Sequence, residues 1–193
     1  MNPTIIGIDP GQSGGIAWRA AGSVYAVPMP KTQGDMLAQL KMIHALSTKD
    51  CVGELAGVPP ICYMEKPPMY IGGSDIPGST VAVMFENIGF CKGVVQALGI
   101  PLYEITPQTW MKSLGIGKVT RQRAPNGATA DEKKDVARLN AQAKRDWKNK
   151  LKGEAQRRYP TLAITLAKAD AILIMDYGLR QNGMAAPVAQ SLL

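Results

Sequence analysis

The sequence has little of what several protein classes require. One of its 193 residues is a histidine and three are cysteines. His44 lies far along the chain from the acidic motifs described below, so a Ser-His or Cys-His mechanism has little to build on. The cysteines are odd in number and form no Cys-x-x-Cys pair, which argues against a disulfide framework or a zinc site and predicts free thiols in a reducing compartment. No run of residues approaches the roughly 18 consecutive apolar residues that a membrane span requires.

The remaining composition is that of a folded domain. Hydrophobic residues make up 46% of the chain and charged residues 19%, which provides enough apolar material for a core and excludes a disordered polymer. The length predicts one domain, or one domain with a sizeable insertion. The first residues contain no basic segment followed by an apolar run, so we expect no signal peptide and a cytoplasmic protein.

Positive charge is concentrated in one segment. The formal net charge of the chain is +7, but the segment from Lys112 to Arg158 has 14 basic and 5 acidic residues, a net charge of +9. The rest of the chain therefore carries −2. A basic segment on a nearly neutral body is typical of a protein that binds the phosphate backbone of nucleic acids. A solvated, salt-bridged helix without a partner gives the same pattern, so the charge does not decide the function by itself.

The first part of the chain alternates short apolar runs with turn residues. Strands are predicted at residues 4–9, 14–19, 23–28, 61–65 and 102–105. Helical spacing of apolar residues predicts helices at 35–46, with Asp35 available as the cap, and at about 79–98. Thr106-Pro107 is expected to open a short helix through Lys112, because proline favours the first helical position.

The second part of the chain is dominated by a polar helix. A loop is predicted over 115–130, followed by a helix from Asp131 to about Arg158 with a narrow apolar stripe, and by a strongly apolar helix over 166–179. The whole order predicts an α/β fold whose sheet mixes an antiparallel meander with parallel strands. We expect one domain over 1–181, including a basic loop-helix segment at about 115–158, and a C-terminal tail over 182–193.

Three carboxylates are placed where they could converge. Asp9 and Glu65 each lie at the carboxyl end of a predicted strand and would emerge at one edge of the sheet if the strands are neighbours. Asp170 lies at the start of the closing helix, where it would face the positive end of the helix dipole. Oxygen ligands without histidine or cysteine suit Mg²⁺ or Mn²⁺, and such clusters commonly hold two ions that clamp a phosphodiester. Taken singly, each carboxylate is more simply explained as a cap, a turn residue or a surface charge.

Three motifs surround these carboxylates. They are Ile6-Gly7-Ile8-Asp9-Pro10-Gly11 with Gly14-Gly15, Met64-Glu65-Lys66-Pro67, and Lys168-Ala169-Asp170-Ala171-Ile172-Leu173-Ile174. Together they resemble the RuvC family of Holliday-junction resolvases, and most of all the RuvC-like nucleases of bacteriophages. The resemblance extends through 107–112 and 152–155, so it covers nearly the whole chain. It implies an RNase H-like fold with a mixed five-stranded sheet flanked by helices, a homodimer, and Mg²⁺-dependent symmetrical nicking of four-way DNA junctions in a bacterial or phage-infected cell.

The resemblance also implies roles for individual residues. Asp9, Glu65 and Asp170 match the family's metal-binding carboxylates, which hold two Mg²⁺ ions per active site, with Mn²⁺ as a substitute. The family usually has a fourth ligand, an acid or histidine, three or four residues before the last of these. In this sequence Leu166 and Ala167 stand there.

Asp176 is held in reserve as the fourth ligand. It lies six residues after Asp170, a rotation of roughly 240° around a helix, so its side chain is expected to point elsewhere.

Candidate DNA-binding residues follow from the same resemblance. Lys152 matches a basic residue near the scissile phosphate, and Lys112 is a weaker candidate that could equally be a surface lysine. Met69-Tyr70 stand where the family carries an aromatic residue that probes the open centre of the junction, although a core tyrosine would fit there too. The loop over 115–123 and the helix after it are longer and more basic than the family norm. We expect this loop to add DNA contacts through Lys118, Arg121 and Arg123.

These observations support three functional hypotheses. The first is a metal-dependent, structure-selective DNA endonuclease with two active sites in a dimer. The second is a non-catalytic protein that binds branched DNA on the same fold, as the absent fourth ligand suggests. The third is an actin-like ATPase or sugar kinase, because those families also open with an Ile-Asp-x-Gly strand, but 193 residues are too few for their two lobes. The Gly115-to-Lys118 stretch lacks the spacing of a phosphate-binding loop, so no nucleotide cofactor is implied.

Overall fold

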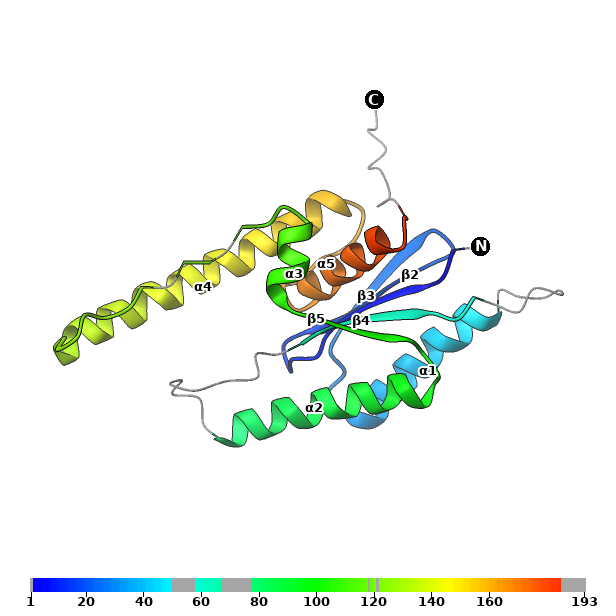
Figure 1. The fold of residues 1–193 in the computed structure, drawn as a ribbon, viewed down its shortest axis with the longest axis horizontal. Coiled ribbons are helices and arrows are strands. Elements are labelled where there is room, and N and C mark those ends of the chain that lie inside the picture. The colour runs from blue at the N-terminus through cyan, green and yellow to red at the C-terminus, as the bar shows by residue number, and fades with distance from the viewer. Residues whose placement is uncertain (1, 50–57, 67–77, 118, 121, 185–193) are drawn as a thin grey trace, which may run out of the picture.

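Five strands form one mixed sheet at the centre of the protein, which we describe from a computed structural model (Figure 1). The structure describes residues 2–49, 58–66, 78–117, 119–120 and 122–184. The strands are β1 (Ile5–Asp9), β2 (Gly15–Ala20), β3 (Ser23–Pro28), β4 (Ile61–Glu65) and β5 (Leu102–Ile105), in the order β3-β2-β1-β4-β5. The first three strands pair antiparallel, whereas β4 pairs parallel with both β1 and β5. This order and these directions are those of the RNase H-like fold, and they confirm the predicted α/β class.

Helices cover both faces of the sheet (Figure 1). One face carries α1 (Gln33–Lys49) and α2 (Gly78–Ala97), whose apolar sides form one core with residues from β1, β2 and β4. The opposite face carries α3 (Pro107–Ser113), α4 (Ala130–Arg158) and α5 (Leu166–Gln181), which form a second core with the other sides of the strands. Because successive side chains of β1 point to opposite faces, Ile5 belongs to one core and Ile6 to the other.

Helix α5 lies closest to the sheet because glycines leave room for it. A Cβ atom at Gly7 of β1 would lie 2.4 Å from the carbonyl oxygen of Ala171 and 2.4 Å from the amide nitrogen of Met175. With hydrogen in that place, the α5 backbone packs directly on β1, and residues 171–179 of α5 are all buried. The helix that carries Asp170 is therefore anchored to the strand that ends at Asp9.

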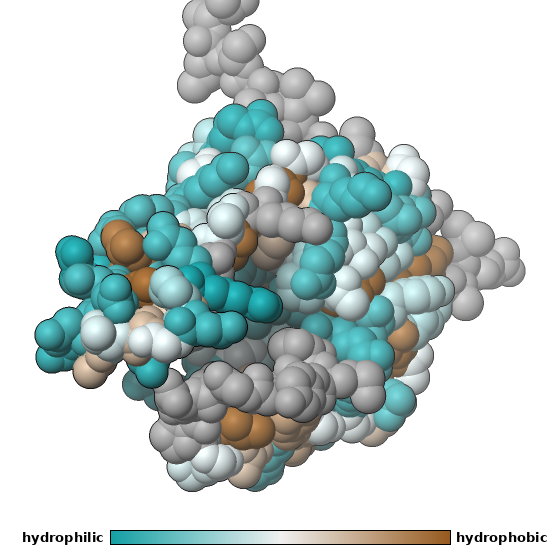
Figure 2. Space-filling view, turned by 60° about the vertical axis from the view of Figure 1, so that its left-hand side comes forward, coloured by the Kyte–Doolittle hydropathy of each residue, from teal (hydrophilic) through white to brown (hydrophobic). Residues whose placement is uncertain are grey.

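Helix α4 packs on the body at one end only. Leu151 and Ala155 are buried in the core, whereas residues 131–146 are exposed or half-buried and project from the body (Figure 1). The connection from α3 runs alongside this projecting part, and Asn140 holds it by exchanging two hydrogen bonds with the backbone of Gln122, at 2.9 and 3.0 Å. We call residues 119–146 of the described chain the arm. Its surface is mostly hydrophilic, with isolated hydrophobic spots (Figure 2).

The element boundaries agree with the sequence prediction to within about three residues, with one correction. Helix α1 begins at Gln33, so Thr32, and not Asp35, occupies the capping position. The Thr32 hydroxyl accepts a hydrogen bond from the Asp35 amide at 3.1 Å and donates one to the Asp35 carboxylate at 2.7 Å. Threonine followed three residues later by an acid is the pattern of a capping box, which the apolar spacing alone did not reveal. Within the described residues, no helix is long and apolar enough to cross a membrane.

Candidate active site

Asp9 and Glu65 lie at the carboxyl ends of two neighbouring parallel strands, as predicted. Ile8 of β1 pairs with Met64 of β4, so each carboxylate follows directly after a paired residue at the same edge of the sheet. The backbone after β1 turns tightly there, and the amide of Gly11 donates a hydrogen bond of 3.2 Å to the Asp9 carboxylate.

Gly14 keeps room for the Asp9 side chain. A Cβ atom at this position would lie 2.2 Å from the Asp9 carbonyl oxygen and 2.6 Å from its carboxyl carbon. Gly14 of the first motif therefore has a steric role at the site.

Asp170 approaches the same edge from α5, accompanied by a lysine that the sequence analysis missed. Helix α5 begins at Leu166, so Asp170 is its fifth residue and lies beyond the first turn, which corrects the expectation that it sits at the helix start. The ammonium nitrogen of Lys148, on α4, lies 3.7 Å from the Asp170 carboxylate oxygen Oδ2. In the sequence, Lys148 directly follows Trp147, which belongs to the apolar stripe of α4. A basic residue next to this stripe was the sequence signal that could have identified Lys148 as a site residue.

The three carboxylates and Lys148 form one electrostatic cluster. Burial, followed by the negative charge of Asp9, raises the pKa of Glu65 to about 8. The same two causes raise the pKa of Asp170 to about 6. Burial also raises the pKa of Asp9, against the lowering effects of the Gly11 hydrogen bond and of Lys148. Lys148 lowers the pKa of all three acids, so a single ammonium group partly neutralises three partly buried carboxylates.

Trp110 fixes the orientation of Glu65. Its indole, fully buried on α3, donates a hydrogen bond of 3.0 Å from Nε1 to Oε2 of Glu65. This contact holds one carboxylate oxygen and leaves the other available, and it joins α3 to the site. The sequence predicted α3 as a short helix but gave no sign that its tryptophan would contact Glu65.

The cluster has the chemistry of a divalent-metal site, although its side chains are not drawn together as around an ion. All the donors are carboxylate oxygens, which suit Mg²⁺ and Mn²⁺, and their pKa values are raised by burial and, for Glu65 and Asp170, by the neighbouring charge of Asp9. Among the residues that the structure describes, no three acidic, histidine or cysteine side chains are close enough to hold a metal ion as they stand. Asp9, Glu65 and Asp170 therefore fit a cation by composition and charge, and their side chains would have to close around it.

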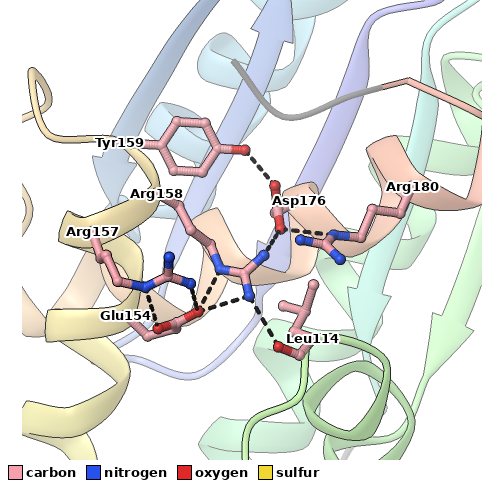
Figure 3. A network of polar contacts seen from close by, with 7 residues as sticks. All are labelled: Leu114, Glu154, Arg157, Arg158, Tyr159, Asp176 and Arg180. Carbon is pink, nitrogen blue, oxygen red and sulfur yellow. Dashed lines mark hydrogen bonds and ion pairs between the residues drawn. The ribbon is translucent and has the colours of Figure 1, made fainter. Parts of the chain in front are cut away.

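A buried ion-pair network sets the position of α4 and so of Lys148 (Figure 3). The guanidinium of Arg158, at the end of α4, donates to Asp176 of α5 at 2.6 Å and to the carbonyl oxygen of Leu114, just after α3, at 3.0 Å. Arg158 also donates to Glu154 at 2.7 Å, and the Tyr159 hydroxyl donates to Asp176 at 2.7 Å. One arginine thus links the three helices that supply Trp110, Lys148 and Asp170.

Asp176 belongs to this network and not to the carboxylate cluster. Its side chain is fully buried, and its two oxygens accept hydrogen bonds from Arg158, Tyr159 and Arg180. The expectation that it points away from Asp170 therefore holds. Leu166 and Ala167 stand at the start of α5, and they offer no side-chain donor for a metal.

The other candidate residues lie on or near α4. Lys152 is half-buried one helical turn after Lys148, on the same side of the helix. Lys112 is exposed at the end of α3, and Arg123 is exposed on the connection between α3 and α4. Met69, Tyr70, Lys118 and Arg121 lie outside the described residues.

Part of the positive charge of the basic segment is used inside the protein. Arg158 is almost completely buried between Asp176 and Glu154. Arg157 forms a bidentate salt bridge with Glu154, with donor–acceptor distances of 2.7 and 3.0 Å. Arg158 links α4 to α5 and to the end of α3, whereas the exposed Arg157 is paired within α4, so the unpaired charge available to an outside partner comes from residues nearer the arm.

Comparison with known proteins gives matches among solved structures only. No protein-family model and no curated protein sequence matches this chain. A structure of RuvC from Thermus thermophilus aligns over 96% of this chain and 99% of its own, with 14% identity and a TM-score of 0.48. A second structure, T. thermophilus RuvC in complex with a Holliday junction substrate, aligns over the same shares with 16% identity and a TM-score of 0.49. These values are too low to support an argument about activity; the assignment of the RNase H-like fold rests on the strand order and directions.

Proposed function

We propose that this chain is a metal-dependent endonuclease that resolves four-way DNA junctions by symmetrical nicking as a homodimer. The observation that carries the proposal is the cluster of Asp9, Glu65 and Asp170 at one edge of an RNase H-like sheet, electrostatically coupled to each other and to Lys148. Clustered carboxylates with raised pKa values are an unfavourable arrangement for the metal-free fold, and such arrangements occur at functional sites.

The proposed chemistry assigns each carboxylate a metal-holding role. One oxygen of Asp9 is held by the Gly11 amide and one oxygen of Glu65 by the Trp110 indole, which leaves the second oxygen of each carboxylate to bind a metal. When bound, two Mg²⁺ ions supply Lewis-acid activation of water and stabilise the departing 3′-oxygen, which leaves a 5′-phosphate and a 3′-hydroxyl. The chain itself positions the scissile phosphate, for which Lys148 and Lys152 stand on the adjoining face of α4.

The arm is proposed to guide the DNA to the site. It extends from the end of α4 that carries Lys148, and it presents exposed basic residues including Arg138 and Arg123. A duplex held by such contacts would bind more weakly as salt increases, because the phosphate contacts release counterions.

A second function is favoured by one observation. No three donors among the described residues are gathered tightly enough to hold an ion, and no acid stands at Leu166 or Ala167. A protein that binds branched DNA without cutting it would need the basic segment from Lys112 to Arg158 but would not need side chains that close around a metal ion.

An Asp9→Asn variant tests the proposal. The wild-type protein should nick a synthetic four-way junction at symmetrical positions in Mg²⁺ or Mn²⁺, and the variant should bind the junction without nicking it. Asp35→Asn, at an exposed position on α1, is the matched control and should cut like the wild type. Cleavage by Asp9→Asn at the wild-type rate would refute the assignment, and tight wild-type binding without nicking in either metal would favour the non-catalytic alternative.

A further inference from the structure

A groove lies between α3, the connection that follows it, and α4. Its volume is about 770 Å³, and its apolar lining includes Met111, Ile116, Val119 and the indole of Trp147, with Lys112 among the lining residues. Ile116 and Met111 also pack on the core beneath it, so the floor of the groove is held by the body of the protein. A nucleobase is well below this volume, so the groove has room for one base and part of its sugar.

The polar groups around the groove favour an anionic, aromatic ligand. The ammonium group of Lys150 lies 5.2 Å from the centre of the Trp147 ring, a cation–π contact. Lys112 is exposed at the groove, and the acidic residues nearest in sequence to Trp147 are not among its lining residues. The Trp147 ring, with the Lys150 ammonium group over it, and the Lys112 side chain in the groove are together complementary to a base joined to a phosphate, and a stacking base would take the place of Lys150 over the ring.

The groove adjoins the carboxylate cluster through two pairs of consecutive residues. Trp147 precedes Lys148, which contacts Asp170, and Met111 follows Trp110, which contacts Glu65. One wall of the groove and one side of the carboxylate cluster are therefore built from the same two helices. A strand whose phosphate lies at the carboxylates would have its next nucleotides within reach of Trp147.

We propose that this groove, the Trp147 groove, binds one unpaired nucleotide of the DNA strand that the carboxylates act on. The base stacks on the Trp147 indole, and the adjoining phosphate lies between Lys112 and Lys150. The inference rests on the proposed function, and it adds a site that would favour DNA with an unpaired base close to the point of cleavage. An apolar peptide segment would fit the lining but would not use the two lysines.

The test measures the coupling between Trp147 and a base. Asp9→Asn protein, which is expected to bind without cutting, is titrated with two four-way junctions that carry one unpaired nucleotide at the exchange point, either with its base or abasic. The parent should bind the base-containing junction roughly tenfold more tightly, within the range of base–aromatic stacking. Adding Trp147→Leu should remove this preference, and Trp147→Phe should retain most of it.

Two further variants separate stacking from charge and from folding. Lys150→Gln should weaken binding of both junctions alike, because it removes a phosphate contact. Lys134→Gln, also exposed on α4 but far along the arm, should leave the preference for the base unchanged. Thermal unfolding of each variant checks that the fold is intact.

The outcomes distinguish this inference from the proposed function. If the junctions bind and wild-type protein cuts them, but Trp147→Leu keeps the preference for the base, the groove proposal is overturned and the nuclease proposal stands. If the parent binds neither junction, both proposals fail. If Trp147→Leu and Trp147→Phe lose affinity equally for both junctions, the groove proposal is also overturned, since that result shows that the indole has a packing role.

Discussion

Replacing Glu65 by glutamine should stabilise the metal-free protein at neutral pH. The Glu65 carboxyl is partly buried beside two other acids, and its pKa is raised from an ordinary value of 4.5 to about 8. Glutamine has nearly the same shape and carries no charge, and its side-chain oxygen can still accept the hydrogen bond from Trp110. The substitution thus removes the cost of ionisation while it keeps the contact.

The sign and size of the effect follow from proton linkage. Between pH 4.5 and 8 the folded chain keeps the Glu65 proton whereas the unfolded chain loses it, so the folded state binds more protons there. Stability is therefore highest below about pH 4.5 with respect to this group and falls as the pH rises towards 8. At pH 7 the difference amounts to on the order of 3 kcal/mol, since each unit between the two pKa values corresponds to about 1.4 kcal/mol.

Urea unfolding in EDTA measures this effect at several pH values. The free energy of unfolding of the wild type should fall between pH 5 and pH 8, while that of Glu65→Gln should change much less, so that the variant is the more stable protein at pH 8. Glu86→Gln, at an exposed position on α2, is the control and should follow the wild type. A variant that is no more stable than the wild type at pH 8 would refute the reasoning, because it would show that Glu65 ionises without cost in the fold.

Four further predictions concern the ion-pair network, the sheet, an exposed position of α2 and the lysine at the site. Asp176→Asn should lower the free energy of unfolding by about 3 kcal/mol, measured in urea, because it removes the fully buried carboxylate partner of Arg158 and leaves this buried charge with Glu154 as its remaining carboxylate. Gly7→Ala should cost about 3 kcal/mol or more, because the added methyl group meets the α5 backbone. Gly89→Ala on α2, where the added atom meets nothing, should instead stabilise the protein by about 1 kcal/mol in the same assay. Lys148→Met should bind Mn²⁺ several-fold more tightly by calorimetry, because the metal no longer competes with an ammonium group; weaker binding would contradict that view.

The strands and most helix ends were predictable because their signals are local. Alternating or continuous apolar runs bounded by glycine and proline defined β1 and β4, and the position of Asp9 and Glu65 at their ends followed from the runs themselves. The parallel pairing of β1 with β4, on which the meeting of these two acids depends, was an assumption that the structure confirms.

The lysine at the site was not predictable in the same way. Lys148 and Lys152 lie one turn apart on a helix rich in basic residues, and the choice between them depends on where α4 docks along α5. That position is set by Arg158 and Asp176, which are 18 residues apart and whose contact has no sequence signature. Likewise, the Trp110 contact with Glu65 joins residues 45 positions apart. Contacts that depend on how helices dock are the part that local patterns could not supply.

Because α4 is anchored at one end only, the arm and the carboxylate cluster are separable parts. The buried contacts that anchor α4, those of Leu151, Ala155 and Arg158, lie towards the Arg158 end of the helix, whereas the arm is held by its own Thr129–Glu132 capping box and by the Asn140 contact with Gln122. The arm could therefore be shortened by whole helical turns together with its partner segment while the site kept its geometry. Under the proposed function, the length and charge of the arm can vary without altering the carboxylate cluster, so related chains with arms of different lengths would share this cluster and differ in the DNA that they bind.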